Sequence, residues 1–327
     1  MSHPTLLNAL RRSPVFALLA LGATGCVHHI PEPVPAVTFG PETPPNFQPF
    51  PNLQVCWVEF ATGSLPHGAA VAHGALKANV PSTQSGILLK SPSGNWLIDG
   101  GQSAQLKEEM KEVHGLGGFF LRQAAHGWTV TSTPADALRA AGVDPSTLAG
   151  VIPTHAHFDH LGGLLDLAGL PVLLPQAEID LANSILAHGG FGVLPKEARI
   201  LVARARPLTF DGGPFLAWAS SHDLYGDGSV VLFPMEGHTP GSLGARIHLG
   251  DGRELLLVGD TVWVREGYED REPKGWLAQP FDADHAAVDH QIQRLWALHK
   301  ARPDLHILPA HDRRAWVEMF GHPGCTG

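Results

Sequence analysis

One run of metal-ligating side chains constrains the fold of this chain more than any other feature: Thr154-His155-Ala-His157-Phe-Asp159-His160-Leu-Gly162-Gly163. The run follows an apolar strand predicted at 148–153 and leads into a helix predicted at 161–168. Side chains two residues apart on an extended segment point the same way, so His155 and His157 can bind one ion. Asp159 and His160 lie on the turn into the helix and are displaced towards a second position. The sequence therefore predicts a metal site at the carboxyl end of this strand.

Further donors follow three later strands in the same manner. His238 lies in Gly237-His238-Thr-Pro-Gly241, Asp260 in Val258-Gly-Asp260-Thr261, and His311 in Pro309-Ala-His311-Asp312. Since each donor comes at the carboxyl end of a predicted strand, several strand ends can converge on one edge of the sheets. The chain also holds twenty histidines, an excess that favours metal chemistry. Nitrogen and carboxylate donors without thiolate suit zinc, although such sets also accept iron or manganese.

The ordered donor set resembles the ligand set of the metallo-β-lactamase superfamily: His155, His157, Asp159, His160, His238, Asp260 and His311. The resemblance extends over essentially the whole domain and implies that family's fold, an α/β four-layer αβ/βα sandwich. It implies that His155, His157 and His238 hold a first metal ion. Asp159, His160 and His311 would hold a second, with Asp260 bridging the two. The implied cofactors are thus two zinc ions per chain.

The same resemblance implies a hydrolytic mechanism. Two adjacent dications share a water molecule and lower its pKa, so that the bridging hydroxide attacks an electrophilic carbonyl or phosphorus. Asp159 and Asp260 are the predicted catalytic residues on this basis. Asp99 ends a strand whose counterpart in the family supports the first metal-binding loop. We expect Asp99 to support the ligands from behind, the alternative being an ordinary turn residue at a strand end.

Two details point to a branch of the superfamily. His157 stands where flavodiiron proteins carry glutamate, which disfavours electron-transfer chemistry. The stretches Asp223-Leu-Tyr-Gly-Asp-Gly-Ser229 and His157-Phe-Asp-His160 are similar to those of N-acyl-homoserine lactonases. Those enzymes carry a tyrosine shortly after the bridging aspartate, whereas this chain has Trp263, whose indole donates a hydrogen bond but cannot shuttle a proton. Trp263 is predicted to contact substrate or lie behind the ligands, with plain packing as the alternative.

The predicted activity is therefore hydrolysis of a lactone, ester or related small-molecule electrophile. β-Lactam or organophosphate hydrolysis at the same site is the alternative within the enzyme class. An exported metal-binding protein without turnover is the alternative outside it.

A formal net charge of −9 argues against a nucleic-acid partner. A chain with 44% hydrophobic and 16% charged residues is neither disordered nor a coiled coil.

The pattern along the chain fits two facing sheets with helices outside, because each half has strands first and helices after. No linker interrupts residues 52–320, so we expect one domain at 52–327. The predicted strands are 55–60, 86–90, 95–99, 148–153, 172–174, 215–219, 230–235, 244–249, 254–258 and 305–309. The predicted helices are 103–113, 134–141, 161–168, 176–188 and 284–301.

The first residues read as an export signal over 1–25. Arg11 and Arg12 precede a short apolar segment that is too short to cross a bilayer. The following Leu21-Gly-Ala-Thr-Gly-Cys26 resembles the lipobox of bacterial lipoproteins, in which the cysteine is lipidated. The alternative is an ordinary cleaved signal. We expect a protein in the periplasm or cell envelope, anchored to a membrane through Cys26.

A proline-rich segment follows Cys26, and two further cysteines lie near the ends of the predicted domain. Eight prolines between residues 31 and 51 favour an extended tether at 26–51. Once Cys26 is acylated, Cys56 and Cys325 remain, one near each end of the domain. They could pair in an oxidising compartment or stay as two thiols.

Overall fold

The computed structural model describes residues 30, 36–42, 53–75, 77–114, 118, 121–122, 125–190 and 192–326. The predicted signal segment and Cys26 lie outside these residues. None of the described helices is long and apolar enough to cross a membrane.

The described part of the chain contains strands, α-helices and single 3-10 turns in mixed order. The strands are β1 Gln54–Pro66, β2 Asn79–Lys90, β3 Asn95–Ile98, β4 Thr129–Val130, β5 Leu148–Ile152, β6 Val172–Pro175, β7 Ala205–Leu208, β8 His222–Asp223, β9 Val230–Pro234, β10 Leu243–His248, β11 Glu254–Leu257, β12 Leu305–Leu308 and β13 Gly324–Cys325. The α-helices are α3 His67–Ala70, α4 Leu106–Glu109, α6 Pro134–Ala140, α7 Phe158–Leu161, α8 Gln176–His188, α9 Pro195–Arg204, α10 Glu266–Glu269, α11 His285–Ala301 and α12 Arg313–Phe320. The 3-10 turns are η1 Met110–Glu112, η2 Ala125–Gly127, η3 Pro145–Thr147, η4 Gly162–Leu165 and η5 Gln279–Phe281.

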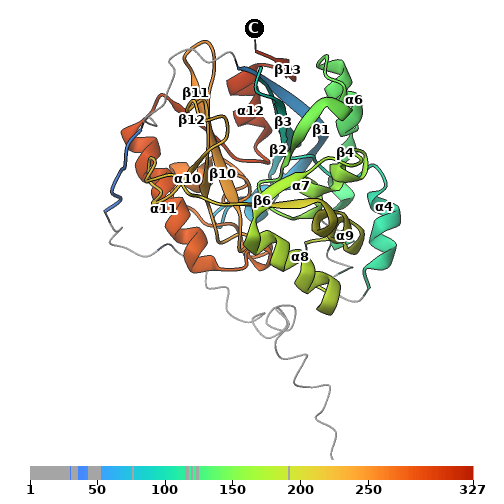
Figure 1. The fold of residues 1–327 in the computed structure, drawn as a ribbon. Helices are drawn as coiled ribbons and strands as arrows, with labels where there is room; N and C mark the ends of the chain where they lie inside the picture. Colours follow the sequence, from blue (N-terminus) through green and yellow to red (C-terminus); the bar gives the residue numbers. More distant parts are fainter. Residues whose placement is uncertain are drawn as a thin grey trace, which may run out of the picture.

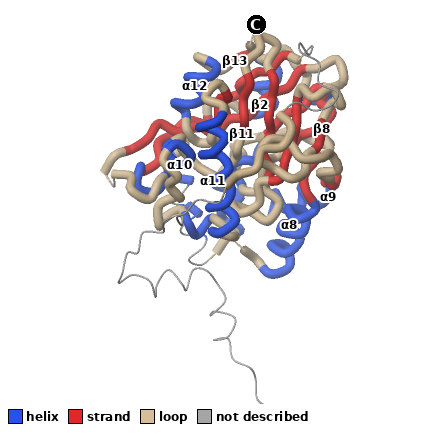
Figure 2. The backbone as a smooth tube through the Cα atoms, turned by 90° about the vertical axis from the view of Figure 1, so that its left-hand side faces the viewer, coloured by secondary structure: helices blue, strands red, loops and turns tan. Residues whose placement is uncertain are grey.

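Two sheets face each other, as the sequence predicts. An eight-stranded sheet has the order β13-β1-β2-β3-β5-β6-β7, with β4 paired to β1, and a five-stranded sheet has the order β12-β11-β10-β9-β8. Helices α8 and α9 lie on the side of the first sheet and α11 on the side of the second (Figure 1). Seen from the α11 side, α10 and α11 lie in front of the strands (Figure 2). The result is the predicted four-layer arrangement of helices, sheet, sheet and helices.

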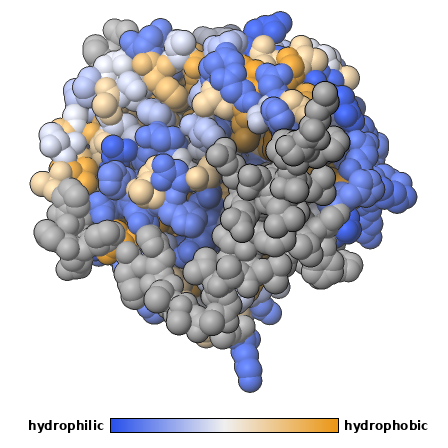
Figure 3. Space-filling model, turned by 90° about the horizontal axis from the view of Figure 1, so that it is seen from below, coloured by the Kyte–Doolittle hydropathy of each residue, from blue (hydrophilic) through white to orange (hydrophobic). Residues whose placement is uncertain are grey.

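The alternation of side chains along each strand explains why the layers stack. Val55 and Trp57 of β1 pack between the sheets together with Leu232 of β9. Their neighbour Cys56 faces the helices on the outer side of the first sheet, whereas Phe233 packs with the helix α11 layer. Because successive strand residues point to opposite faces, apolar residues at consecutive positions serve two cores. Where the surface is coloured in the view from below, hydrophilic areas predominate and hydrophobic areas are scattered among them (Figure 3).

Several sequence-predicted elements differ from the structure. The apolar run at 215–219 is not a strand: Phe215 and Trp218 form an isolated bridge around a tight turn, and Leu216 has a φ of 48°. The run is apolar because Trp218 stacks on Phe233 in the core, with ring centroids 3.9 Å apart. The helix predicted at 103–113 is limited to α4 and η1, and that at 161–168 begins earlier, as α7, and continues as η4. Strand β7 and helices α9 and α12 were not predicted.

The two ends of the described chain are fastened to the domain. A disulfide joins Cys56 to Cys325, which resolves the open question of their pairing. Part of the predicted spacer, residues 36–42, lies against the domain and is not a free tether there. The Gly40 N–H donates to the Leu216 carbonyl at 2.6 Å, and Glu42 pairs with Arg302 at 2.7 Å.

Two buried glutamates on the first-sheet side give a testable pH dependence. Glu197 of α9 is completely buried, and both it and Glu109 have an oxygen without a hydrogen-bond partner among the described residues. Burial, together with the carboxylates of Glu109 and Asp159, raises the pKa of Glu197 well above its usual value. The folded state therefore keeps a proton that the unfolded state has released, so stability falls as the pH rises from about 4.5 through the folded pKa.

We expect Glu197→Gln to raise the free energy of unfolding at pH 8 and to leave it nearly unchanged at pH 4. Glutamine keeps the shape of the protonated side chain and cannot ionise. Urea unfolding of the metal-free protein at both pH values measures the effect, with the exposed Glu108→Gln as control. Equal stabilisation at the two pH values would contradict the assignment.

Candidate dinuclear metal centre

The candidate site lies where the carboxyl ends of strands from both sheets meet. His155 and His157 follow β5, and Asp159 and His160 belong to α7 immediately after them. In the second sheet, β11 pairs parallel with β12, while β10 is antiparallel to both β9 and β11. Strands β9, β11 and β12 therefore run in one direction, and the residues that follow them emerge at one edge. These residues include His238, Asp260 and His311.

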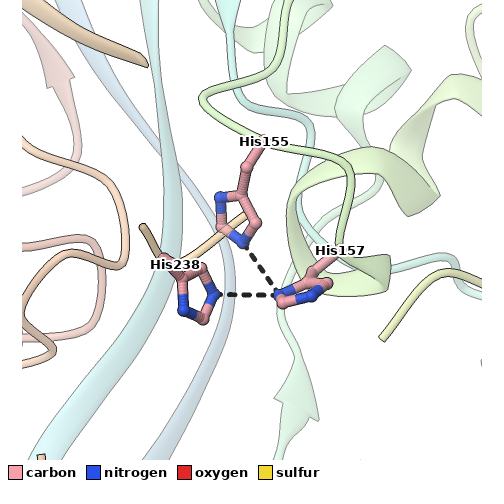
Figure 4. A group of neighbouring side chains, drawn as sticks. All are labelled: His155, His157 and His238. Atoms are coloured by element: carbon pink, nitrogen blue, oxygen red, sulfur yellow. Dashed lines mark hydrogen bonds between the residues drawn. The ribbon is translucent and has the colours of Figure 1, made fainter. Parts of the chain in front are cut away.

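The first group of donors contains three buried histidines, His155, His157 and His238. His157 Nδ1 lies 3.1 Å from His155 Nε2 and 2.9 Å from His238 Nε2 (Figure 4). The three nitrogens therefore converge on one point from two loops. Three imidazoles directed at one point can hold a single metal ion and leave a position open.

The second group contains Asp159, His160, Asp260 and His311. His311 Nε2 lies 3.3 Å from Asp159 Oδ2 and 3.3 Å from Asp260 Oδ1. His160 Nε2 lies 3.3 Å from the same Asp260 Oδ1. Two carboxylates and two imidazoles thus face a common point next to the first group.

Asp260 connects the two groups through its two oxygens. Oδ2 lies 3.6 Å from His238 Nε2, on the side of the first group, whereas Oδ1 faces His160 and His311 of the second. Among the described residues, the buried atoms His160 Nε2 and Asp260 Oδ1 have no hydrogen-bond partner. Buried polar atoms are normally satisfied, so these two indicate a missing partner between them. A pair of metal ions fits this donor set, and the structure brings together all seven predicted ligands.

The electrostatics differ between the groups. Burial and the neighbouring His238 imidazole lower the pKa of His157 to about 3. Burial likewise lowers the pKa of His155 well below its usual value, aided by His160. Burial also acts to lower the pKa of His311, but the Asp260 and Asp159 carboxylates outweigh it and raise that pKa to about 10. Without metal, His155 and His157 are therefore neutral near pH 7, whereas His311 holds a proton that a bound cation would displace.

Asp99 supports the second group, and through Thr154 the loop that carries the first. Its Oδ2 lies 3.0 Å from His160 Nδ1, and its Oδ1 accepts a hydrogen bond of 2.7 Å from the Thr154 N–H. Asp99 is buried and has a φ of 60°, a conformation that few residues other than glycine adopt. These contacts favour the predicted supporting role over that of a turn residue.

Trp263 uses its single donor within the protein. Its Nε1–H donates to Asp260 Oδ2 at 2.8 Å, and its ring lies 6.0 Å from the His311 ring and 5.9 Å from that of Phe281. The indole therefore holds the connecting carboxylate from behind.

Three supporting residues were missed by sequence reasoning. Glu178 of α8 is completely buried and accepts hydrogen bonds from the Ala156 N–H at 2.8 Å and the Gly241 N–H at 2.7 Å. Asp282 lies behind His238, and Lys274 lies behind Asp282. Glu178 could have been found, because it occupies the apolar face of a predicted helix at helical spacing from Ala182 and Ile185. Asp282 and Lys274 lie in an irregular loop without any periodic signal.

Comparisons with known proteins agree with this geometry. The family model described as "Metallo-beta-lactamase superfamily" matches residues 80–311. The N-acyl homoserine lactonase AttM of Agrobacterium fabrum is 24% identical over 247 residues, covering 72% of this chain and 84% of the relative. A probable metallo-hydrolase of Mycobacterium tuberculosis is 27% identical over 240 residues, covering 69% and 73% respectively. The crystal structure of an N-acyl homoserine lactone hydrolase with N-hexanoyl-L-homoserine at its catalytic metal centre aligns with a TM-score of 0.63 at 18% identity, covering 84% of this chain and all of that one.

Proposed function

Given that the chain belongs to the metallo-beta-lactamase superfamily of hydrolases, we propose that it uses two zinc ions to hydrolyse a lactone. The proposed ligands are those predicted from the sequence: His155, His157 and His238 for the first ion, Asp159, His160 and His311 for the second, and Asp260 between them. The observation that carries the proposal is the position of Asp260, whose two oxygens face different donor groups. Structural zinc sites are usually closed and single, so a connected pair favours catalysis over storage.

The protein supplies position and charge to this chemistry. Two divalent cations, when bound, supply Lewis acidity that activates a water molecule and polarises the scissile carbonyl. Asp159 and Asp260 would supply negative charge to the bound cations. Asp99, through His160 Nδ1, fixes the orientation of one imidazole. Trp263 fixes the orientation of Asp260, and its indole is unable to carry a proton from the leaving group.

The proposed substrate is an N-acyl homoserine lactone. Support for this substrate comes from relatives in sequence and from structures with the same fold. AttM of Agrobacterium fabrum, for example, is named an N-acyl homoserine lactonase. Small lactones are electrophilic esters, the substrate class that suits a dinuclear hydrolytic centre.

The proposed location is the cell envelope, with a lipid anchor at Cys26. We propose a signal segment at 1–25, a proline-rich connecting segment at 26–51, of which residues 36–42 lie against the domain, and the hydrolase domain at 52–327. The Cys56–Cys325 disulfide supports export, because disulfides persist in oxidising compartments and are rare in the cytosol.

Metal content and turnover of the full chain, purified in detergent, test the function together. We expect about two zinc ions per chain, by elemental analysis, and hydrolysis of an acyl homoserine lactone in preference to a β-lactam and a phosphotriester. Removal of metal by a chelator should abolish turnover, and added zinc should restore it. Two zinc ions with turnover of the β-lactam or phosphotriester only would contradict the substrate. Metal without any turnover would favour the metal-binding alternative.

A further inference from the structure

Lys274 is a buried lysine behind the metal centre. It lies in the loop between α10 and η5 and is 1% exposed. Removing an ammonium group from water is strongly unfavourable unless an opposite charge and hydrogen bonds compensate for the lost hydration. Here its Nζ lies 2.6 Å from Asp282 Oδ1 and donates to the Thr261 carbonyl at 3.2 Å. The lysine is therefore held at a fixed place, unlike a solvated surface charge.

The carboxylate that binds Lys274 also binds a proposed metal ligand. Asp282 Oδ1 lies 2.7 Å from His238 Nδ1, so one oxygen is shared between the ammonium and the imidazole. The other nitrogen of the ring, Nε2, faces His157 and Asp260. An acceptor at Nδ1 keeps the hydrogen on that nitrogen and leaves the Nε2 lone pair directed at the metal position.

The same lysine also contacts the support of Asp260. The Thr261 carbonyl, which accepts its second hydrogen bond, belongs to the residue next to Asp260. Its Nζ also lies 6.0 Å from the ring centroid of Trp263, whose indole donates to Asp260 Oδ2. The ammonium of Lys274 therefore contacts residues that support two proposed ligands, His238 and Asp260. Its contact with Asp282, which binds His238, is the shorter and more direct of the two.

We propose that Lys274 is a positioning residue that sets the metal affinity of the His155, His157 and His238 group by holding Asp282 against His238. The proposal rests on the proposed function, because it presumes that this group binds a metal ion. Lys274 touches neither metal nor substrate and acts through Asp282. Without the ammonium, Asp282 would be a buried carboxylate with one partner, free to turn away from His238 towards water.

A double-mutant cycle on metal affinity tests the proposal. The variants are Lys274→Met, Asp282→Asn and the two together, in the full chain, with zinc titrated in competition with a chromophoric chelator. We expect Lys274→Met and Asp282→Asn each to raise one of the two zinc dissociation constants by about 10–100-fold. The double variant should bind like Asp282→Asn alone, because Lys274 acts through that carboxylate.

Two further variants assign the affected site. Asp99→Asn replaces the oxygen that faces His160 and keeps one oxygen for the Thr154 N–H, so it should raise mainly the other dissociation constant. Lys111→Met removes an exposed lysine paired with Glu108 and should change neither. The two zinc constants of the unaltered chain test the proposed function separately, so failure there is distinguishable from failure of the inference.

Three results would overturn the inference. The first is a Lys274→Met variant with unchanged zinc affinity. If that variant also loses thermal stability, the Lys274–Asp282 ion pair is merely structural. Equal weakening of both sites is the second. The third is a double variant that binds zinc much more weakly than Asp282→Asn, which would show that Lys274 acts by another route. This last comparison also serves if Lys274→Met alone does not fold, since the double variant carries no uncompensated charge.

Discussion

Asp260→Asn should remove most of the turnover while the domain stays folded. Asparagine has nearly the same shape, but its amide nitrogen cannot ligate a cation, so only one of the two donor groups keeps an oxygen from this residue. We expect a larger loss than the roughly 10–100-fold that an outer partner of a metal ligand costs. Elemental analysis should show fewer zinc ions per chain than in the unaltered protein. Turnover of the lactone, circular dichroism and zinc content measure the three effects.

Asp304→Asn is the matched control, because Asp304 is an exposed aspartate that pairs with Arg302 and precedes β12, at the opposite end of that strand from His311. It should leave turnover and zinc content unchanged. Full turnover in Asp260→Asn would show that the carboxylate does not connect two ions in the working enzyme. A protein that binds zinc but has no turnover before the substitution would instead support the metal-binding alternative.

The ligand set could be predicted from the sequence because its members follow strands whose apolar runs are easy to recognise. His155, His238 and His311 each come directly after such a run, and strand direction brings the three ends together. The strand predicted at 215–219 was wrong for a related reason. An apolar run indicates that a segment is buried but does not indicate its backbone conformation. Phe215 and Trp218 are buried in a tight turn, and this turn is as apolar as a strand.

The supports of the ligands were harder to predict, because they depend on tertiary contacts between distant segments. Asp282 reaches His238 across an irregular loop, and only the folded chain shows that Lys274 is buried there. Trp263 was recognised as a departure from the lactonase pattern, but its use of the indole donor on Asp260 follows only from the structure. Spacing predicts which residues share a strand end and does not predict which loop folds back over them.

Glu178→Gln should lower both the stability of the domain and its zinc affinity. Each carboxylate oxygen of Glu178 accepts one backbone N–H, from Ala156 in the first metal-binding loop and from Gly241 in the loop after His238. A glutamine has one such oxygen, so its amide group faces a backbone N–H and leaves it without an acceptor. A buried donor left unsatisfied costs about 1–3 kcal/mol. Chemical unfolding and zinc titration measure the two losses.

The direction of the second loss follows from where the two loops lie. Ala156 stands between His155 and His157, and Gly241 is three residues from His238, so Glu178 holds both sides of the first donor group in register. The zinc dissociation constant of the first group should therefore rise more than that of the second group. Asp180→Asn on the exposed face of the same helix is the control and should alter neither quantity. A loss of stability with unchanged zinc affinity would mean that the loops keep their positions without Glu178, and that strand β5 and α7 alone place the histidines.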